Sequence, residues 1–338
     1  MKFIFLTILI SVSFISNSQT LANSTRSGDF DDPGVWDVPS NVNFGVNIQN
    51  GHTVNIPSGK TFMNAKINLI GTGKLNFATT TSKWIPAPDG SSVSNAASSA
   101  SEIAKYYPNK TDGIYFINLP TVGVQQVYCL MDSKYDGGGW MLAMKATTGT
   151  TFNYDASYWT NVNTLNPNDI SLNNGDAKYN VMNYFQAKDI MAIWPTLSNI
   201  GTLTGSTMST LSTWSWLKNN FHLSGSRTTL ISKFSGSQTT YVTNTSGDVS
   251  GIPEYNSTYF SRQRAFTFYG LNYTGNSGKR VRWGFAFNNE TDQDSNDCSG
   301  GIGMNARSYS AGDEWSWNGD GQTIIGGNTS YRVQIFVR

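Results

Sequence analysis

Asp112-Gly113-Ile114-Tyr115-Phe116-Ile117 is the stretch that decides the fold of this 338-residue chain. Val127-Tyr128-Cys129-Leu130-Met131 follows it, and then comes Gly137-Gly138-Gly139-Trp140. β-Branched and aromatic residues are typical of strands, and glycines allow tight turns between strands. We therefore expect successive strands here, turned by Gly113 and the triple glycine, with their aromatic side chains facing one core.

The same mixture of residues continues to the end of the chain, which indicates one large domain over residues 99–338. A helix is expected at 100–106, with Ser98 or Ser99 as its cap, and another at 212–219. The predicted fold class is α+β. Strands are expected in five places, at 113–117, 126–130, 140–145, 280–288 and 331–337.

A smaller module is expected before this domain, at residues 23–78. Short alternating runs such as Val46-Asn47-Ile48-Gln49 and Lys74-Leu75-Asn76-Phe77 are bounded there by Gly, Asn or Pro. These runs predict a small all-β module, built as a solenoid or as a sandwich. Residues 79–98 are rich in Pro, Ser and Ala, which predicts a semi-flexible linker.

Residues 1–22 have the pattern of a secretory signal peptide. Lys2 precedes an apolar run from Phe3 to Ile15, and Ser16-Asn17-Ser18 and Leu21-Ala22 both offer small residues for cleavage. A membrane anchor is the alternative, but the run is shorter than a spanning helix. We expect a secreted, extracellular or cell-surface protein without membrane insertion.

Charge and rare residues exclude several classes of function. A net charge of +1 without a basic run argues against nucleic acid as a partner. The only histidines, His52 and His222, lie in different modules, which disfavours a zinc site and a Ser-His-Asp enzyme. No enzyme activity is expected. Cys129 and Cys298 could form a disulfide after export, or could both be free and buried.

An acidic stretch between Asn288 and Cys298 is the strongest candidate for a functional site. Its acidic residues stand out in a chain that is only 13% charged, and alternating oxygen ligands are typical of a loop that wraps calcium. A glycine run follows (Gly300, Gly301, Gly303). A solvated loop without an ion is the alternative. The predicted Ca²⁺ ligands are Glu290, Asp292, Asp294, Asn296, Asp297 and, beyond the glycines, Asp313.

Aromatic residues beyond the glycine run are candidates for sugar stacking. Trp315 and Trp317 would share one face of a strand because side chains alternate. Packing in the core is the alternative role for either tryptophan. Tyr309 is a weaker candidate for the same ligand-binding surface.

The motifs of residues 99–338 resemble a fibrinogen-like domain, and most closely the intelectins, which are secreted calcium-dependent lectins. The order of the motifs carries this resemblance. They are the opening stretches quoted above, Gln186-Ala187-Lys188-Asp189-Ile190 with Ile193-Trp194, Phe287-Asn288-Asn289-Glu290, Cys298-Ser299-Gly300-Gly301-Ile302-Gly303, Gly312-Asp313, Trp317-Asn318-Gly319-Asp320-Gly321, and Val333-Gln334-Ile335-Phe336-Val337-Arg338.

The resemblance implies a fold of twisted antiparallel sheets, short helices and long loops. It also implies a calcium ion whose two open coordination positions take a vicinal diol of a sugar. Asn296 and Asp297 would stand at the ligand positions before Cys298, with Asp313 at the later acidic position and Trp317 in the pocket wall.

This chain departs from the family pattern at several positions. Ala100 replaces a family cysteine, so Cys129 lacks its usual partner, and a Cys129–Cys298 bridge would be a substitute. The family's histidine ligand is missing, and Gly326 or Gly327 stands where a second pocket aromatic is found. The sugar preference of the family therefore does not transfer to this chain.

The sequence as a whole predicts a secreted lectin that binds cell-surface or microbial glycans through calcium and could form a homo-oligomer. One alternative is a fibrinogen-like protein-binding or structural module with purely structural calcium. Another is a viral or phage receptor-binding adhesin, since such proteins also join short β stems to glycan-binding heads.

Overall fold

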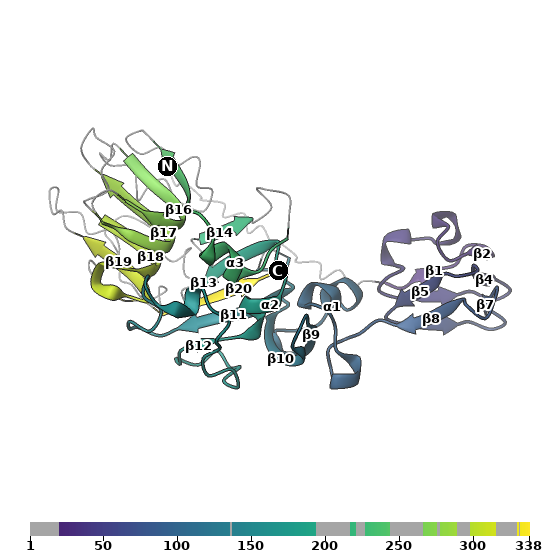
Figure 1. The fold of residues 1–338 in the computed structure, drawn as a ribbon. Helices are drawn as coiled ribbons and strands as arrows, with labels where there is room; N and C mark the ends of the chain where they lie inside the picture. Colours follow the sequence, from purple (N-terminus) through teal and green to yellow (C-terminus); the bar gives the residue numbers. More distant parts are fainter. Residues whose placement is uncertain are drawn as a thin grey trace, which may run out of the picture. The chain divides into compact units, whose positions relative to one another are not determined.

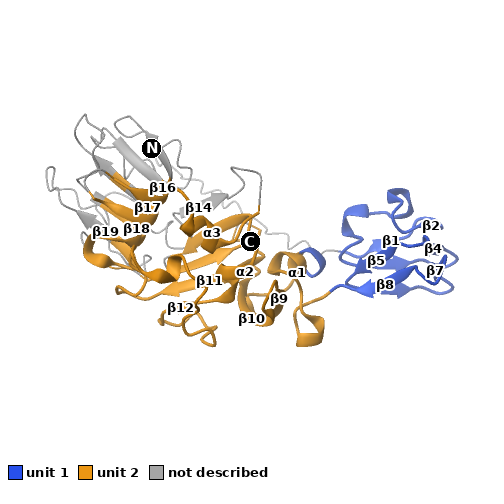
Figure 2. Cartoon of the chain, in the orientation of Figure 1, with its two compact units in different colours: residues 1–87, 105–107 blue, residues 88–104, 108–338 orange. Residues whose placement is uncertain are grey.

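The computed structural model describes residues 20–135, 137–193, 217–220, 227–243, 266–275, 278–288, 298–315, 330 and 332–338. The chain divides into two compact units, coloured separately in Figure 2. Unit 1 holds residues 1–87 and 105–107, and unit 2 holds residues 88–104 and 108–338. Figure 1 labels their strands and helices.

Unit 1 is a β-solenoid, one of the two forms that the sequence left open. All its strand pairs are parallel and form sheets of order β1-β3-β6, β2-β4-β7 and β5-β8, so each turn after the first adds one strand to each sheet. The strands are β1 Ala22–Asn23, β2 Gly28–Asp29, β3 Val46–Ile48, β4 Thr53–Ile56, β5 Thr61–Asn64, β6 Ile67–Leu69, β7 Lys74–Phe77 and β8 Lys83–Pro86.

Alternation along each short strand separates the core of the solenoid from its surface. Val46, Ile48 and Val54 point inward and are fully buried. Asparagines at outward positions stack in columns and donate from one turn to the turn before it. Asn47 Nδ2 lies 2.9 Å from Asn23 Oδ1, and Asn68 Nδ2 lies 2.8 Å from Asn47 Oδ1. The alternating runs of the sequence thus encode both layers.

The first turn of the solenoid is closed at its outer edge by a folded-back segment. The 3₁₀ helices η1 (Pro33–Val35) and η2 (Pro39–Asn41) take the place of a third strand in this turn. Thr25 N donates to Val35 O at 2.8 Å, and Asp37 N donates to Asn23 O at 3.0 Å. Backbone groups at the edge of β1 are therefore satisfied within the module.

The boundary between the units differs from the predicted linker at 79–98. Lys83–Pro86 forms strand β8, which pairs with β5, so the solenoid extends to Ala87. Residues 90–97 are also hydrogen-bonded, because Phe116 N donates to Gly90 O and Asn118 N donates to Ala97 O. Both segments are parts of folded units, since Pro and Ser are compatible with strand ends and 3₁₀ turns.

Unit 2 contains a large antiparallel sheet of order β14-β13-β20-β11-β10-β9, with β12 paired to β11. Strand β11 is buried along its whole length, so both faces of the sheet are covered there. The strands are β9 Gly113–Leu119, β10 Gly123–Leu130, β11 Trp140–Ala146, β12 Ala177–Lys178, β13 Asp189–Ile193, β14 Leu217–Asn220 and β20 Val333–Val337.

A second antiparallel sheet of unit 2 follows the order of the chain, β15-β16-β17-β18-β19. Strands β16, β17, β18 and β19 are labelled in Figure 1. The strands of this sheet are β15 Thr239–Thr243, β16 Phe266–Thr274, β17 Arg280–Asn288, β18 Cys298–Met304 and β19 Ala311–Trp315. The described short helices after the solenoid strands are η3 Val93–Asn95, α1 Ala100–Tyr106, η4 Ser157–Trp159, α2 Asn180–Tyr184, α3 Leu230–Ser235 and η8 Ala306–Ser308. They belong to unit 2, except for the last two residues of α1.

The described part of the chain is thus mostly sheet with few helices, which agrees with the coarse α+β prediction. The helix expected at 100–106 is confirmed as α1, and Ser99 caps it, because its Oγ accepts from Glu102 N at 3.0 Å. The helix expected at 212–219 is wrong from Leu217 onward, since 217–220 form strand β14. Strand pairing outweighs local helix propensity there. Residues 212–216 lie outside the described residues.

Gly113 does not have the turn role expected of it. It begins β9 with no positive φ, whereas all three glycines at 137–139 have positive φ values between 75° and 88°. The tight turn before Trp140 is therefore the glycine-dependent one. No helix among the residues described here has the length and apolar character needed to cross a membrane.

Candidate functional site

One end of the five-stranded sheet gathers the ends of three neighbouring strands. Asn288 ends β17 and pairs with Phe266, which begins β16. Cys298 begins β18 and pairs with Phe287 on one side and with Trp315, the last residue of β19, on the other. The last residue of β17, the first residue of β18 and the last residue of β19 therefore lie at this same end.

The acidic stretch joins Asn288 of β17 to Cys298 of β18, so both of its attachment points lie at this end of the sheet. Six of the predicted site residues fall outside the described residues. They are Glu290, Asp292, Asp294, Asn296, Asp297 and Trp317.

Asp313 and Trp315 are placed by the register of β18 and β19. Asp313 pairs with Gly300, and Trp315 pairs with Cys298. At about 3.4 Å per residue, the backbone of Asp313 lies about 7 Å along the strand from that of Trp315. The backbones of both predicted residues are thus close to the attachment point of the acidic stretch.

Tyr309 does not belong to this end of the sheet. It follows η8 in the turn between β18 and β19, where Met304 N donates to Tyr309 O at 3.0 Å. It also packs against the buried cluster that contains Tyr273, Val281 and Met304. The length of β18, about 20 Å, separates this turn from Cys298. Tyr309 and Trp315 therefore lie at opposite ends of the hairpin formed by β18 and β19, and the ligand-binding role of Tyr309 stays a prediction.

The glycine run has a packing role inside the sheet. Gly301 on β18 is paired with Gly284 on β17. A Cβ on Gly301 would lie 2.3 Å from Trp283 O and 2.6 Å from Gly284 Cα, and its φ of 135° is one that side chains rarely adopt. The glycines thus allow two strands to approach closely beside the acidic stretch.

Ser299 is a residue of this region that the sequence did not single out. It is fully buried, pairs with Glu314, and its hydroxyl has no hydrogen-bond partner among the residues that the structure describes. An unsatisfied buried hydroxyl costs about 1–3 kcal/mol, so such a group calls for an explanation such as a bound ion. The position of Ser299 directly after Cys298 is the only feature of the sequence that could have marked it as a candidate site residue.

Cys129 is a free thiol in the structure. It lies on β10, is fully buried, and its pKa is raised by burial and by the nearby charge of Asp112. The structure thus shows, for Cys129, the alternative of a free and buried cysteine instead of a bridge to Cys298. Burial in this form makes the thiol unreactive.

A second oxygen-rich loop, residues 169–176, surrounds the ammonium group of Lys145, which belongs to strand β11. Lys145 Nζ lies 2.8 Å from Asp169 Oδ2 and 2.9 Å from Ser171 O, and it also contacts Asn173 Oδ1. The hydrogen bond from Lys145 lowers the pKa of Asp169. The alternating oxygens of this loop resemble a calcium-binding pattern, but a buried ammonium fills the position of the ion.

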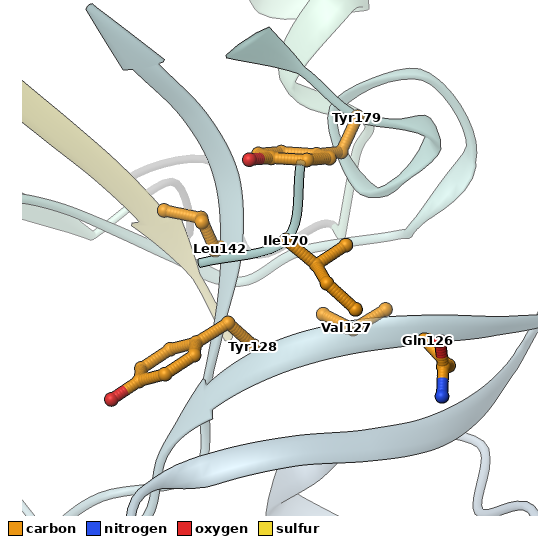
Figure 3. Close-up of a pocket in the computed structure, with 6 residues that line it drawn as sticks. All are labelled: Gln126, Val127, Tyr128, Leu142, Ile170 and Tyr179. Carbon is orange, nitrogen blue, oxygen red and sulfur yellow. The ribbon is translucent and has the colours of Figure 1, made fainter. Parts of the chain in front are cut away.

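Other parts of the described structure offer weaker sites. No three His, Cys, Asp or Glu side chains within it come close enough to hold a metal ion. A small cavity against β10 is lined by Val127, Leu142 and Tyr179, among others (Figure 3). Its volume of about 10 Å³ has room for one water molecule at most, far below the space that a sugar needs.

His52 has a structural role in unit 1. Its Nδ1 lies 2.9 Å from Ser24 Oγ, and that oxygen accepts from Gln49 N at 2.8 Å. His222 lies outside the described residues.

Comparison with known proteins identifies no relative, because no protein-family model and no curated protein matches this chain. The function of the site therefore has to be inferred from its own residues and geometry.

Proposed function

We propose that this protein is a secreted lectin that binds glycans through calcium at the end of the five-stranded sheet defined by Asn288, Cys298 and Trp315. One observation carries the proposal. The register of β17, β18 and β19 brings the attachment points of the acidic stretch beside the strand that carries Asp313 and Trp315. A cation ligand set and an aromatic residue thus come from neighbouring strands.

The charges near this end favour a bound cation. Glu290, Asp292, Asp294 and Asp297 lie in one short segment, and Asp313-Glu314 enters the neighbouring strand. Carboxylates held this close repel one another unless a cation or protons neutralise them. Calcium accepts six to eight oxygen ligands in flexible geometry, which suits a loop rich in Asp and Asn better than it suits magnesium.

The chemistry of recognition would be exchange of ligands on the ion. Carboxylates of Asp294, Asp297 and Asp313 would hold the calcium ion, and the ion would supply two open coordination positions for a vicinal diol of the sugar. Trp315 or Trp317 would then pack against the apolar face of the sugar ring. Each site binds weakly because the diol gives up its own water, so several copies acting together would raise the apparent affinity.

The antiparallel sheets and short helices of unit 2 are compatible with the resemblance to the intelectins. The resemblance adds the expectation that the open calcium positions face a glycan. A structural calcium ion in a protein-binding module is the rival, and it shares the acidic ligands but not the diol exchange.

A calcium titration by calorimetry, run with and without glycerol as the smallest vicinal diol, separates these two functions. A diol-binding site predicts that saturating glycerol raises the apparent calcium affinity, because the two ligands share one ion. If glycerol does not change the calcium affinity, and calcium raises the melting temperature, the result would favour a structural ion. No calcium binding at all would exclude both.

A further inference from the structure

The last turn of the solenoid ends in an open apolar face. Strands β6, β7 and β8 are each the final strand of their sheet. Ile48 and Ile56 are fully buried, whereas Leu69 and Phe77, their register partners in the last turn, are 54% and 46% exposed. The described residues therefore leave these inward-facing side chains uncovered, and the open strand edges lie beside them.

Lysines surround this open end, which we call the tail. Lys66, Lys74 and Lys83 are exposed, and each directly precedes an inward-facing residue of the last turn. No aspartate or glutamate occurs between Asp37 and Asp89. The tail is therefore apolar in its centre and positively charged at its rim.

The opposite end of the solenoid, the head, has the opposite charge. All the acidic residues of the solenoid precede Val38, and the first turn contains one arginine. The folded-back segment covers β1, whereas β2 is the first strand of its sheet and pairs with β4; within the first turn, Asp29 O accepts from Asp32 N at 3.1 Å. The acidic residues of the head are Asp29, Asp31, Asp32 and Asp37, of which Asp29 lies on β2 itself.

We propose that the tail docks onto the head of a second copy of this chain, with β7 of one copy beside β2 of the next. The existing register defines the contact, because Leu75 pairs with Val54 and Val54 pairs with Gly28. If β7 of one copy pairs with β2 of the next in this same parallel register, Leu75 lies opposite Gly28 of the second copy. Asn76 then faces Asp29, and Lys74 comes diagonally within reach of the Asp29 carboxylate.

The distribution of charge favours contact between a head and a tail over contact between two tails. Tail-to-tail contact would bring together two rims of lysines without any acidic residue, and edge lysines are a common protection against such pairing. Contact between head and tail pairs opposite charges. Because the two contacting surfaces differ, the contact is heterologous, and it extends into chains instead of stopping at a dimer.

Sedimentation velocity of the full chain over a range of concentrations tests the proposal. The expected result is a series of species that grows with concentration and shrinks at 1 M salt, where charges are screened within about 3 Å. A monomer at all concentrations would overturn the proposal, as would a dimer that does not grow.

Charge reversal identifies the two surfaces. Lys74→Glu alone and Asp29→Lys alone should each weaken association by about tenfold or more, because like charges then meet. Mixing the two variants should restore association, since each tail then meets an oppositely charged head: the substituted tail of one variant meets the substituted head of the other, and the unchanged Lys74 meets the unchanged Asp29. Lys188→Glu makes the same charge change on an exposed lysine of unit 2 and should leave association unchanged.

Two outcomes of the mixing experiment contradict the proposal. Failure of the mixture to associate, with both variants folded by circular dichroism, would exclude the contact between Lys74 and Asp29. Association of the Asp29→Lys variant alone that is as strong as that of the wild type would indicate that two tails meet, because this variant changes the head and leaves the tail unaltered.

Discussion

Cys298 and Trp315 are register partners across strands β18 and β19. This pairing brings the acidic stretch, which ends at Cys298, beside the last residue of the strand that carries Asp313. Two segments that the sequence singled out separately therefore enter one end of the same sheet. The proposed calcium site depends on this relationship.

Substitution of the proposed ligands should weaken calcium binding. Asp297→Ala and Asp313→Asn each remove one carboxylate, and we expect the calcium dissociation constant to rise about tenfold or more, with glycan binding lost in parallel. Isothermal titration with calcium measures the change. Asp132→Asn is the control, because Asp132 pairs with Lys134 in the loop after β10, a strand of the other sheet. Unchanged calcium affinity in both ligand variants would show that the site is misplaced.

Gly301→Ala should destabilise unit 2 strongly. The added Cβ meets the backbone of β17, which cannot move away as a side chain can, and we expect a loss of about 3 kcal/mol or more. Chemical denaturation measures the loss. Gly113→Ala is the matched control, since open space surrounds Gly113 at the start of β9. Equal stability of the two variants would mean that β17 and β18 are farther apart than described.

Lys178 should make stability depend on pH. Burial lowers the pKa of Lys178 to about 8 from its ordinary value of 10.5. Between these values the unfolded chain binds a proton that the folded chain does not, so stability rises with pH by up to about 3 kcal/mol. Below pH 8 the Lys178 amine is charged in both the folded and the unfolded chain, so this group no longer changes the unfolding free energy with pH.

Lys178→Met tests this dependence. Denaturation at several pH values from 7 to 10 should show that the rise in unfolding free energy disappears in the variant, while the exposed-lysine variant Lys188→Met keeps it. A rise of the same size in Lys178→Met would assign the effect to another group.

The mature N-terminus should lie at Gln19 if the signal peptide is removed. Ala22 is fully buried and pairs with Val46, and Asn41 Nδ2 donates to Thr20 O at 2.8 Å. Cleavage after Ser18 keeps these contacts, whereas cleavage after Ala22 removes the first residue of β1. Mass spectrometry of the secreted protein measures the terminus. A mature chain that begins at Asn23, or one that keeps residues 1–18, would contradict this prediction.

Local pattern was sufficient to predict many elements of the fold. The alternating runs around Val46 and Lys74 predicted strands that the structure contains, because alternate residues of each strand face the inside of the solenoid. The capping serines at 98 and 99 likewise indicated where α1 begins, because a helix cap is a local interaction. These elements are determined by neighbouring residues, so the sequence carries their signal.

Properties that depend on distant residues could not be predicted in the same way. Parallel pairing of β3 with β6 decides between a solenoid and a sandwich, and neither strand alone contains that information. The separation of Tyr309 from Trp315 follows from a hairpin whose turn position the sequence did not specify. The cation in the 169–176 loop comes from Lys145 on β11, well before the loop in the chain. Asp313 was singled out as an acidic residue beyond the glycine run, and Trp315 because alternation would put it on the same face as Trp317; their register partners on β18 could not be predicted.

Binding of the full chain to a glycan array, with calcium, with EDTA and with a competing free vicinal diol, tests the central claim most directly. The account predicts binding that EDTA abolishes, that calcium restores and that the free diol reduces. Glycan binding that persists in EDTA would contradict the calcium mechanism. A protein that binds no glycan, while EDTA only lowers its melting temperature, would contradict the lectin function itself.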